Sequence, residues 1–191
     1  MQRTLIVIPI IHSQEDMGSL GRRLPFDPAR HRRADERWAA IQRWVRALGL
    51  DWTAVRVYQD GLPDTDQAIV RKILAEVQSP NYDLLRWLVA QGAELVGTES
   101  PALMKEEYDH LQAVLTAKDA VAQARARRRY AERAGALLAA RDAYLARRIA
   151  ATLPPGGLGL LFIGQAHQLA PQLPPDIDIR KLPDDLSASS P

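Results

Sequence analysis

The 191-residue sequence contains no cysteine. Disulfide bonds, thiolate metal ligands and a cysteine nucleophile are therefore excluded, and any bound metal must be held by histidine, carboxylate or water. The sequence also lacks an apolar run long enough to cross a bilayer, and its opening segment turns acidic without a small-residue cleavage site. We therefore expect a cytoplasmic protein with no membrane partner.

Aromatic residues make up only 6% of the chain, and the formal net charge is only +2. Most of the excess basic charge lies in the arginine-rich segment 123–148, "QARARRRYAERAGALLAARDAYLARR". No zinc-finger or RNP signature accompanies this segment, so a solvated helix face is favoured over a nucleic-acid surface. A regulatory protein that binds nucleic acid through this helix is the third hypothesis, which steeply salt-dependent binding would support.

Four short apolar segments are typical of β-strands, and long helical patterns separate them. The strands are expected at residues 4–11, 54–59, 93–98 and 158–164. Long helical connections favour parallel pairing, since a tight turn can only reverse a strand. The sequence thus predicts one α/β domain over residues 1–182, with a small, mainly parallel sheet of about four strands flanked by helices. The polar tail 183–191 is predicted to be disordered.

Five helical patterns connect these strands. They cover residues 27–50, 64–78, 79–92, 99–115 and a long carboxyl-side helix over about 117–153. Ser79 and Ser100 each precede a proline, which is the order typical of a helix start. The long helix is rich in alanine and arginine and ends at "PPGG"; a homo-oligomer formed through this helix is an open alternative.

An ionisable side chain follows each predicted strand. These residues are His12, Asp60, Glu99 and His167. Because the carboxyl ends of parallel strands lie along one edge of the sheet, where ligands usually bind, we expect the four side chains to converge. The imidazoles of His12 and His167 should then lie within about one metal-site width of each other.

Each of these residues also has a purely structural interpretation. Asp60 precedes Gly61 in "QDGLP", a sequence typical of a turn, and the turn role is favoured for it. Glu99 lies before a Ser-Pro helix start, where a carboxylate interacts favourably with the helix amino terminus. A lone histidine after a strand is commonly a hydrogen-bonded structural residue, but two such histidines give the functional interpretation equal weight.

Two further polar residues lie near the predicted strand ends. Ser13 and Asp16 have the spacing of a capping box, which explains Asp16 without any chemistry. Glu15 has no such role and is expected to face the site. Gln165 leaves the same strand end as His167 and is a further candidate for ligand binding.

Arg141 lies inside an apolar stripe of the long helix. The apolar members of the stripe are Ala134, Leu137, Leu138, Leu145 and Ile149, at spacings of three and four. An unpaired guanidinium in an apolar interior costs several kcal/mol, roughly, so Arg141 needs an acidic partner or an anionic ligand. Glu99, Asp60 or the substrate can supply that partner.

The closing segment "RDAYLARRIAATLPPGGLGLLFIGQAHQL" resembles the corresponding part of the TraB/Tiki, ChaN-like and erythromycin-esterase-like superfamily. In that superfamily an arginine-containing helix precedes an apolar strand that ends in a Gly-x-x-His motif. Residues 164–167 match the motif, and Arg141 and Asp142 match the arginine-containing helix. The resemblance is specific over the carboxyl-terminal portion and extends to the layout of most of the chain.

The amino-terminal half departs from the superfamily pattern at two places. The superfamily has a second Gly-x-x-His motif after its first strand, where this chain has "PIIH". Here Pro9 replaces the glycine, and His12 matches the histidine. Its second strand commonly ends in a glutamate, where this chain has Gln59 and Asp60. Glu99 can substitute for that acidic residue.

The resemblance implies three different chemistries. Tiki-like members are metal-dependent proteases, esterase-like members are hydrolases in which a histidine acts as general base, and ChaN-like members bind haem. Fold-level likeness does not choose among such functions. We therefore expect a hydrolase for a small-molecule or peptide substrate, and the alternative is a non-catalytic protein that binds haem or another anionic small molecule.

The hydrolase hypothesis has two versions. In the first, His12, His167 and Glu99 or Asp60 bind a divalent metal that lowers the pKa of a bound water. In the second, one histidine is the general base, and Arg141 stabilises the oxyanion or holds an anionic group of the substrate. The expected catalytic residues are His12, Glu99, Arg141 and His167, and the expected cofactor-binding residues are Glu15, Asp60 and Gln165.

Overall fold

The computed structural model describes residues 1–21, 23 and 26–182. The predicted disordered tail 183–191 lies outside the described residues. Along the chain the elements are β1 (Arg3–Ile10), η1 (Glu15–Met17), α1 (Gly18–Gly21), α2 (Pro28–Ala47), η2 (Trp52–Ala54), β2 (Val55–Pro63), α3 (Gln67–Glu76), α4 (Pro80–Ala90), β3 (Glu94–Glu99), α5 (Pro101–Leu115), α6 (Ala120–Thr152), β4 (Leu158–Gly164), η3 (Ala170–Gln172) and β5 (Ile177–Lys181). The elements η1, η2 and η3 are short 3-10 helices.

The strands form one sheet in the order β3-β2-β4-β1-β5, and every pair is parallel. The α/β class, the parallel sheet and the long carboxyl-side helix are confirmed, but the prediction of four strands was wrong. The fifth strand, β5, pairs with β1 at the sheet edge and has one buried residue, Ile177. Five residues with so little apolar burial do not produce the pattern by which a strand is recognised.

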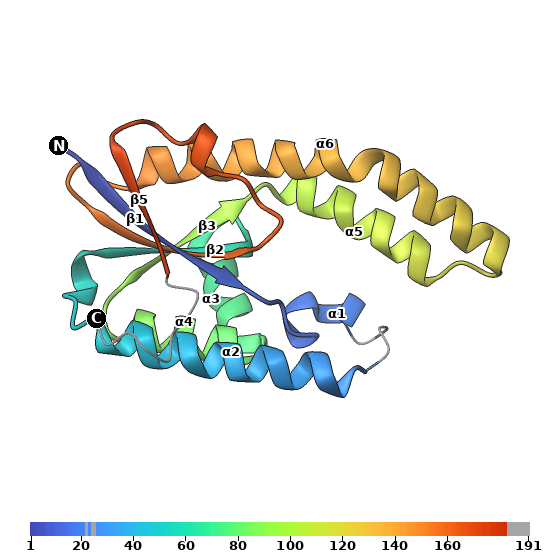
Figure 1. The fold of residues 1–191 in the computed structure, drawn as a ribbon, viewed down its shortest axis with the longest axis horizontal. Helices are drawn as coiled ribbons and strands as arrows, with labels where there is room; N and C mark the ends of the chain where they lie inside the picture. Colours follow the sequence, from blue (N-terminus) through green and yellow to red (C-terminus); the bar gives the residue numbers. More distant parts are fainter. Residues whose placement is uncertain (22, 24–25, 183–191) are drawn as a thin grey trace.

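Helices cover both faces of the sheet, as Figure 1 shows. Helices α2, α3 and α4 lie against one face, where Trp38, Leu85 and Phe162 are fully buried. Helix α6 lies against the other face, where Leu145 and Ile149 pack with Tyr58 and other sheet residues. Strands covered on both faces read as nearly continuous apolar runs, which explains why the sequence predicted four of them.

The helix starts follow from local capping chemistry. The Ser79 and Ser100 side chains accept hydrogen bonds from the backbone N–H groups of Tyr82 and Leu103, and a proline follows each serine. The predicted capping box is confirmed: Ser13 N–H donates to Asp16, and Asp16 N–H donates to the Ser13 hydroxyl. Asp16 also accepts a hydrogen bond from the Ser79 hydroxyl at 2.6 Å, which ties η1 to the start of α4.

Strand β2 does not end where the sequence predicted. It continues through Asp60 to Pro63, and its pairing with β3 shifts register between Gln59 and Pro63. Gly61 has a φ of 81°, a conformation that residues with a side chain rarely adopt. The turn interpretation of Asp60 was therefore wrong: the residue lies within a strand beside an irregularity, and only 4% of it is exposed.

Helices α5 and α6 form a hairpin that extends past the carboxyl ends of the strands (Figure 1). No residue of α5 is buried, and the buried residues of α6 begin only at Leu137. The carboxyl-terminal part of α6 thus belongs to the core, while its amino-terminal part packs mainly on α5. None of the helices in the described part of the chain combines the length and apolarity that crossing a bilayer requires.

Candidate functional site

Asp60 is the central acceptor of a buried polar cluster at the carboxyl edge of the sheet. Its Oδ2 atom accepts hydrogen bonds from the Gly164 backbone N–H at 3.0 Å and from His12 Nε2 at 3.1 Å, and it pairs with His167 Nε2 at 3.4 Å. Its Oδ1 atom accepts from Arg141 Nη2 at 2.9 Å. Burial alone would raise the pKa of Asp60, but the two histidines outweigh it and hold that pKa well below its usual range.

The predicted convergence of the two strand-end histidines is confirmed, because both imidazoles contact the same oxygen atom of Asp60. Their positions come from different elements. His12 follows β1, and His167 follows β4, which lies between β1 and β2 in the sheet. Asp60 of β2 therefore reaches the histidines of the next two strands.

His167 is clamped between two carboxylates. Its Nδ1 is 2.5 Å from Oδ1 of Asp142, whose other oxygen accepts from the Gln168 backbone N–H at 2.9 Å. Burial lowers the pKa of His167, but Asp60 and Asp142 together raise it to about 9. The side chain is 5% exposed. His167 is therefore a buried imidazolium at neutral pH, with both ring nitrogens donating protons.

His12 has a different environment. Its side chain is 34% exposed, and no hydrogen bond among the described residues engages its Nδ1 atom. Burial lowers the pKa of His12, but Asp60 and the more distant Asp16 carboxylate raise it above its usual value. Because the Asp60 carboxylate can only accept, His12 Nε2 carries the proton and Nδ1 presents the lone pair in the neutral form.

Arg141 has acidic partners, as its place in an apolar stripe predicted. Its Nε and Nη2 atoms donate to the two oxygens of Glu99 at 3.2 and 2.6 Å, Nη2 also donates to Asp60, and Nη1 donates to Glu107. The Arg141 side chain is 11% exposed. A guanidinium with these three carboxylates is already engaged, which leaves little of it for an oxyanion or a substrate anion.

Glu99 is fully buried, and burial favours the protonated form of its carboxyl group. Burial raises the pKa of Glu99 to about 7; the neighbouring Asp60 carboxylate adds to that rise, and Arg141 opposes it. Conversely, burial lowers the pKa of Arg141, but Glu99, Asp60 and Glu107 outweigh burial and raise it. Three carboxylates around one guanidinium thus hold an excess of negative charge, and Glu99 is the group that takes up a proton to reduce it.

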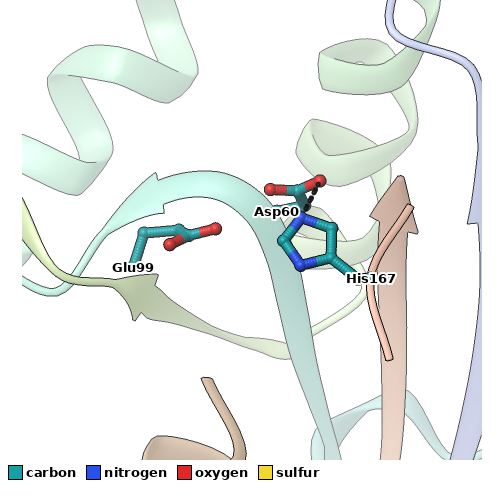
Figure 2. A group of neighbouring side chains, drawn as sticks. All are labelled: Asp60, Glu99 and His167. Carbon is teal, nitrogen blue, oxygen red and sulfur yellow. Dashed lines mark ion pairs between the residues drawn. The ribbon is translucent and has the colours of Figure 1, made fainter. Parts of the chain in front are cut away.

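Asp60, Glu99 and His167 also form a group that can hold a metal ion. One ligand atom of each lies within 4.8 Å of the others. Figure 2 shows Asp60 and His167 joined by their ion pair, with Glu99 on the neighbouring strand β3. In this group Asp60 takes the place that the sequence analysis gave to His12.

Two predicted residues lie outside this cluster. Glu15 is exposed and lines a separate surface pocket together with His31, Asp35 and the start of α4. Gln165 is exposed in the turn after β4. Neither has a hydrogen bond or ion pair with the cluster among the described residues.

Sequence reasoning missed two members of the cluster. Asp142 was noted only beside Arg141 in the superfamily comparison, although its side chain fixes His167. Glu107 lies in the charged helical segment of α5, and no sequence pattern distinguishes it from its charged neighbours. Only the fold brings Glu107 to Arg141, because the α5–α6 hairpin places the two helices side by side.

Gly164, the glycine of the Gly-x-x-His motif, leaves room for the Asp60–His12 contact. A Cβ atom at this position would lie 3.1 Å from Asp60 Oδ2 and 3.3 Å from His12 Nε2. We expect Gly164→Ala to push these groups apart, to lower the pKa of His12 and to destabilise the fold by about 1 kcal/mol. NMR titration of the His12 ring and urea unfolding measure the two effects.

The matched control is Gly135→Ala, in an exposed position of α6 where nothing lies within 4 Å of the added atom. That substitution is expected to stabilise the protein by about 0.5–1 kcal/mol, because alanine is the better helix former, and to leave His12 unchanged. A Gly164→Ala protein with the wild-type His12 titration would contradict the close-approach argument.

The chain was compared with protein-family models, with curated protein sequences and with solved structures, and no comparison gave a significant match. The resemblance to the TraB/Tiki, ChaN-like and erythromycin-esterase-like superfamily therefore stays a prediction, and the functional argument is carried by the geometry of the site.

Proposed function

We propose that the protein is a hydrolase of small-molecule esters in which His12 is the general base. The observation that carries this proposal is the unequal environment of two imidazoles that share one carboxylate oxygen. His12 is 34% exposed, and its Nδ1 has no hydrogen-bond partner in the described part of the chain, whereas His167 is 5% exposed and protonated on both nitrogens. Of the two imidazoles, His12 is therefore the one that can accept a proton from a water molecule once it is neutral.

The proposed reaction follows from this division. Water attacks the ester carbonyl carbon while its proton moves to His12 Nδ1, and the Asp60 carboxylate stabilises the positive charge that develops on the ring. The tetrahedral intermediate then collapses: the bond to the alkoxide breaks, and the proton on His12 passes to the leaving oxygen. His167 remains a fixed cation beside Asp60, and Arg141 fixes the carboxylates rather than contacting the substrate.

The test compares His12→Gln with His31→Gln on short-chain p-nitrophenyl esters. A lost general base lowers kcat by about 10²–10⁴-fold, and we expect that loss for His12→Gln. His31 pairs with Asp35 on the surface, and its replacement should leave kcat unchanged. Equal rates for wild type and both variants would overturn the general-base role.

The pH dependence should be bell-shaped. Activity should rise as His12 loses its proton, above the usual value of 6.5, and fall as His167 loses its proton near pH 9, because Asp60 then lacks its second cation. His167 also gives stability that is fully present below pH 6.5 and is lost as the pH rises through about 9. A rate that keeps rising past pH 9, or that His167→Gln leaves unaltered, would contradict this assignment.

A second candidate is a metal-dependent hydrolase, and the closeness of Asp60, Glu99 and His167 favours it. These three residues would hold the ion, and the ion would supply Lewis-acid activation of water. However, their ligand atoms already have partners: His167 must give up its Nε2 proton, and Arg141 must release its carboxylates. Metal binding should therefore strengthen as the pH rises.

Mass spectrometry for metals after dialysis against mixed divalent ions separates the two versions. Stoichiometric metal in wild type and His12→Gln, but not in His167→Gln, would favour the metal-dependent enzyme. The haem alternative needs an open histidine and an arginine for a propionate. His12 can serve as an axial ligand, but Arg141 is already held by carboxylates, so we expect the protein to leave the Soret band of added haem unshifted.

A further inference from the structure

Glu107 joins helix α5 to the site. Among the described residues, Glu107 is the α5 side chain with a hydrogen bond to Arg141. Its Oε2 accepts from Arg141 Nη1, and its Oε1 accepts from the Tyr130 hydroxyl at 2.9 Å. Tyr130 lies on α6, on the amino-terminal side of Arg141. Each oxygen of the Glu107 carboxylate thus has its own donor, so the carboxylate has a defined orientation.

The guanidinium of Arg141 is planar, and its three nitrogens have different partners. Nε and Nη2 bind Glu99, and Nη2 also binds Asp60. Among the described residues only Glu107 accepts from Nη1. Glu107 therefore fixes the edge of the guanidinium that Glu99 does not reach, and a planar group held on two edges cannot rotate without breaking contacts.

We propose that Glu107, held by Tyr130, is a positioning residue that fixes the Arg141 guanidinium against Asp60. Asp60 in turn orients His12 through Oδ2, so the seating of α5 sets the geometry of the general base. This inference deepens the proposed hydrolysis at His12 and rests on it for its catalytic consequence. The orientation of Arg141 by Glu107 does not depend on the proposed hydrolysis.

The neighbouring Glu106 provides a matched control. It lies one position earlier on α5 and pairs with Arg133 of α6, at a more exposed place of the hairpin. Glu106→Gln removes the same charge from the same helix without touching Arg141. Tyr130→Phe removes the hydrogen bond to Glu107 and no charge, so it separates orientation from electrostatics.

The first measurement is the NMR signal of the Arg141 Nε–H group in the full-length protein, assigned by its absence in Arg141→Met. Glu107→Gln should accelerate the exchange of this proton with water and the rotation of the guanidinium, and Tyr130→Phe should do so to a lesser degree. Glu106→Gln should leave the Arg141 signal unchanged. An Arg141 signal that Glu107→Gln does not alter would overturn the inference, whatever the protein catalyses.

The second measurement is steady-state hydrolysis of the ester that the wild type turns over. Glu107→Gln should lower kcat about tenfold with KM unchanged, because misorientation of a catalytic group acts on the chemical step. A changed Arg141 signal with an unchanged kcat would overturn the positioning role. A changed Arg141 signal in a protein whose wild type hydrolyses no ester would leave Arg141 positioned by Glu107 and would contradict the proposed hydrolysis instead.

Discussion

Replacing Asp60 by asparagine is expected to abolish ester hydrolysis and to lower the free energy of unfolding by about 3 kcal/mol. The Asp60 carboxylate compensates three cationic or protonated partners, His12, His167 and Arg141, and is only 4% exposed. An asparagine amide retains the shape but loses the charge, and its NH₂ group cannot accept a hydrogen bond. The single amide oxygen cannot accept from all four donors of the carboxylate, which are these three side chains and the Gly164 backbone N–H.

The same substitution should change how both histidines titrate. The hydrogen bonds to Asp60 raise the pKa of His12 and contribute to the raised pKa of His167, so both values should fall in Asp60→Asn. Urea unfolding and NMR titration measure the two effects. Asp178→Asn, which removes a surface carboxylate paired with Arg180, is the control and should leave both unchanged. Unaltered histidine titration in Asp60→Asn would disprove the central role of Asp60.

The second large effect is expected for Arg141→Met, which removes the cation shared by Glu99, Asp60 and Glu107. Methionine suits the apolar stripe of α6, but it leaves Glu99 buried without a counter-charge. Removing one partner of a buried ion pair costs about 3–5 kcal/mol. We expect a loss of this size at pH 8.

This loss should depend strongly on pH. In the wild type the pKa of Glu99 is already raised to about 7, so its contribution to stability is present below the usual value of 4.5 and is lost as the pH rises through 7. Without Arg141 the pKa of Glu99 rises further, so stability should keep falling above pH 7. At pH 5 Glu99 is protonated in the folded variant, and the cost of the substitution should be smaller.

The double variant Arg141→Met, Glu99→Gln tests the cause. Removing the buried charge together with its partner should recover part of the stability at pH 8, and the recovery measures the coupling between the two residues. Urea unfolding of the wild type, Arg141→Met, Glu99→Gln and the double variant, each at pH 5 and at pH 8, gives the free energies needed. Purely additive losses, or a single-variant loss that is equal at both pH values, would show that Glu99 is not the group left uncompensated.

Most of the site residues that could be predicted from the sequence were recognised by their position at the end of a predicted strand. His12, Asp60, Glu99 and His167 could be named because each follows an apolar segment of the sequence that predicts a strand, and parallel strands end on one edge. Arg141 could be assigned an acidic partner because a charge in an apolar stripe has few alternatives. The shared sheet edge placed the first four residues, and the periodicity of the long helix placed Arg141.

Other features depend on contacts between distant segments. Asp60 looked like a turn residue because "QDGLP" has turn chemistry, whereas pairing with β3 continues the strand to Pro63 through a register shift. Glu107 and Asp142 lie on helices whose sequences do not reveal which neighbour they face. The different roles of the two histidines follow from burial and from Asp142, neither of which a strand-end motif contains.

The strand order has a consequence for the way in which the chain acquires its structure during synthesis. In the described part of the chain, strand β1 pairs with β4 and β5, while β2 pairs with β3 and β4. A nascent chain that ends before residue 158 therefore has an unpaired β1 and a separate β2–β3 pair, with exposed strand edges that invite association with other chains. The arrival of β4 joins the two pieces and brings His167 to Asp60 at the same moment. The assembly of the sheet and the completion of the site are thus one late, long-range event, and a chain truncated before β4 should aggregate rather than fold.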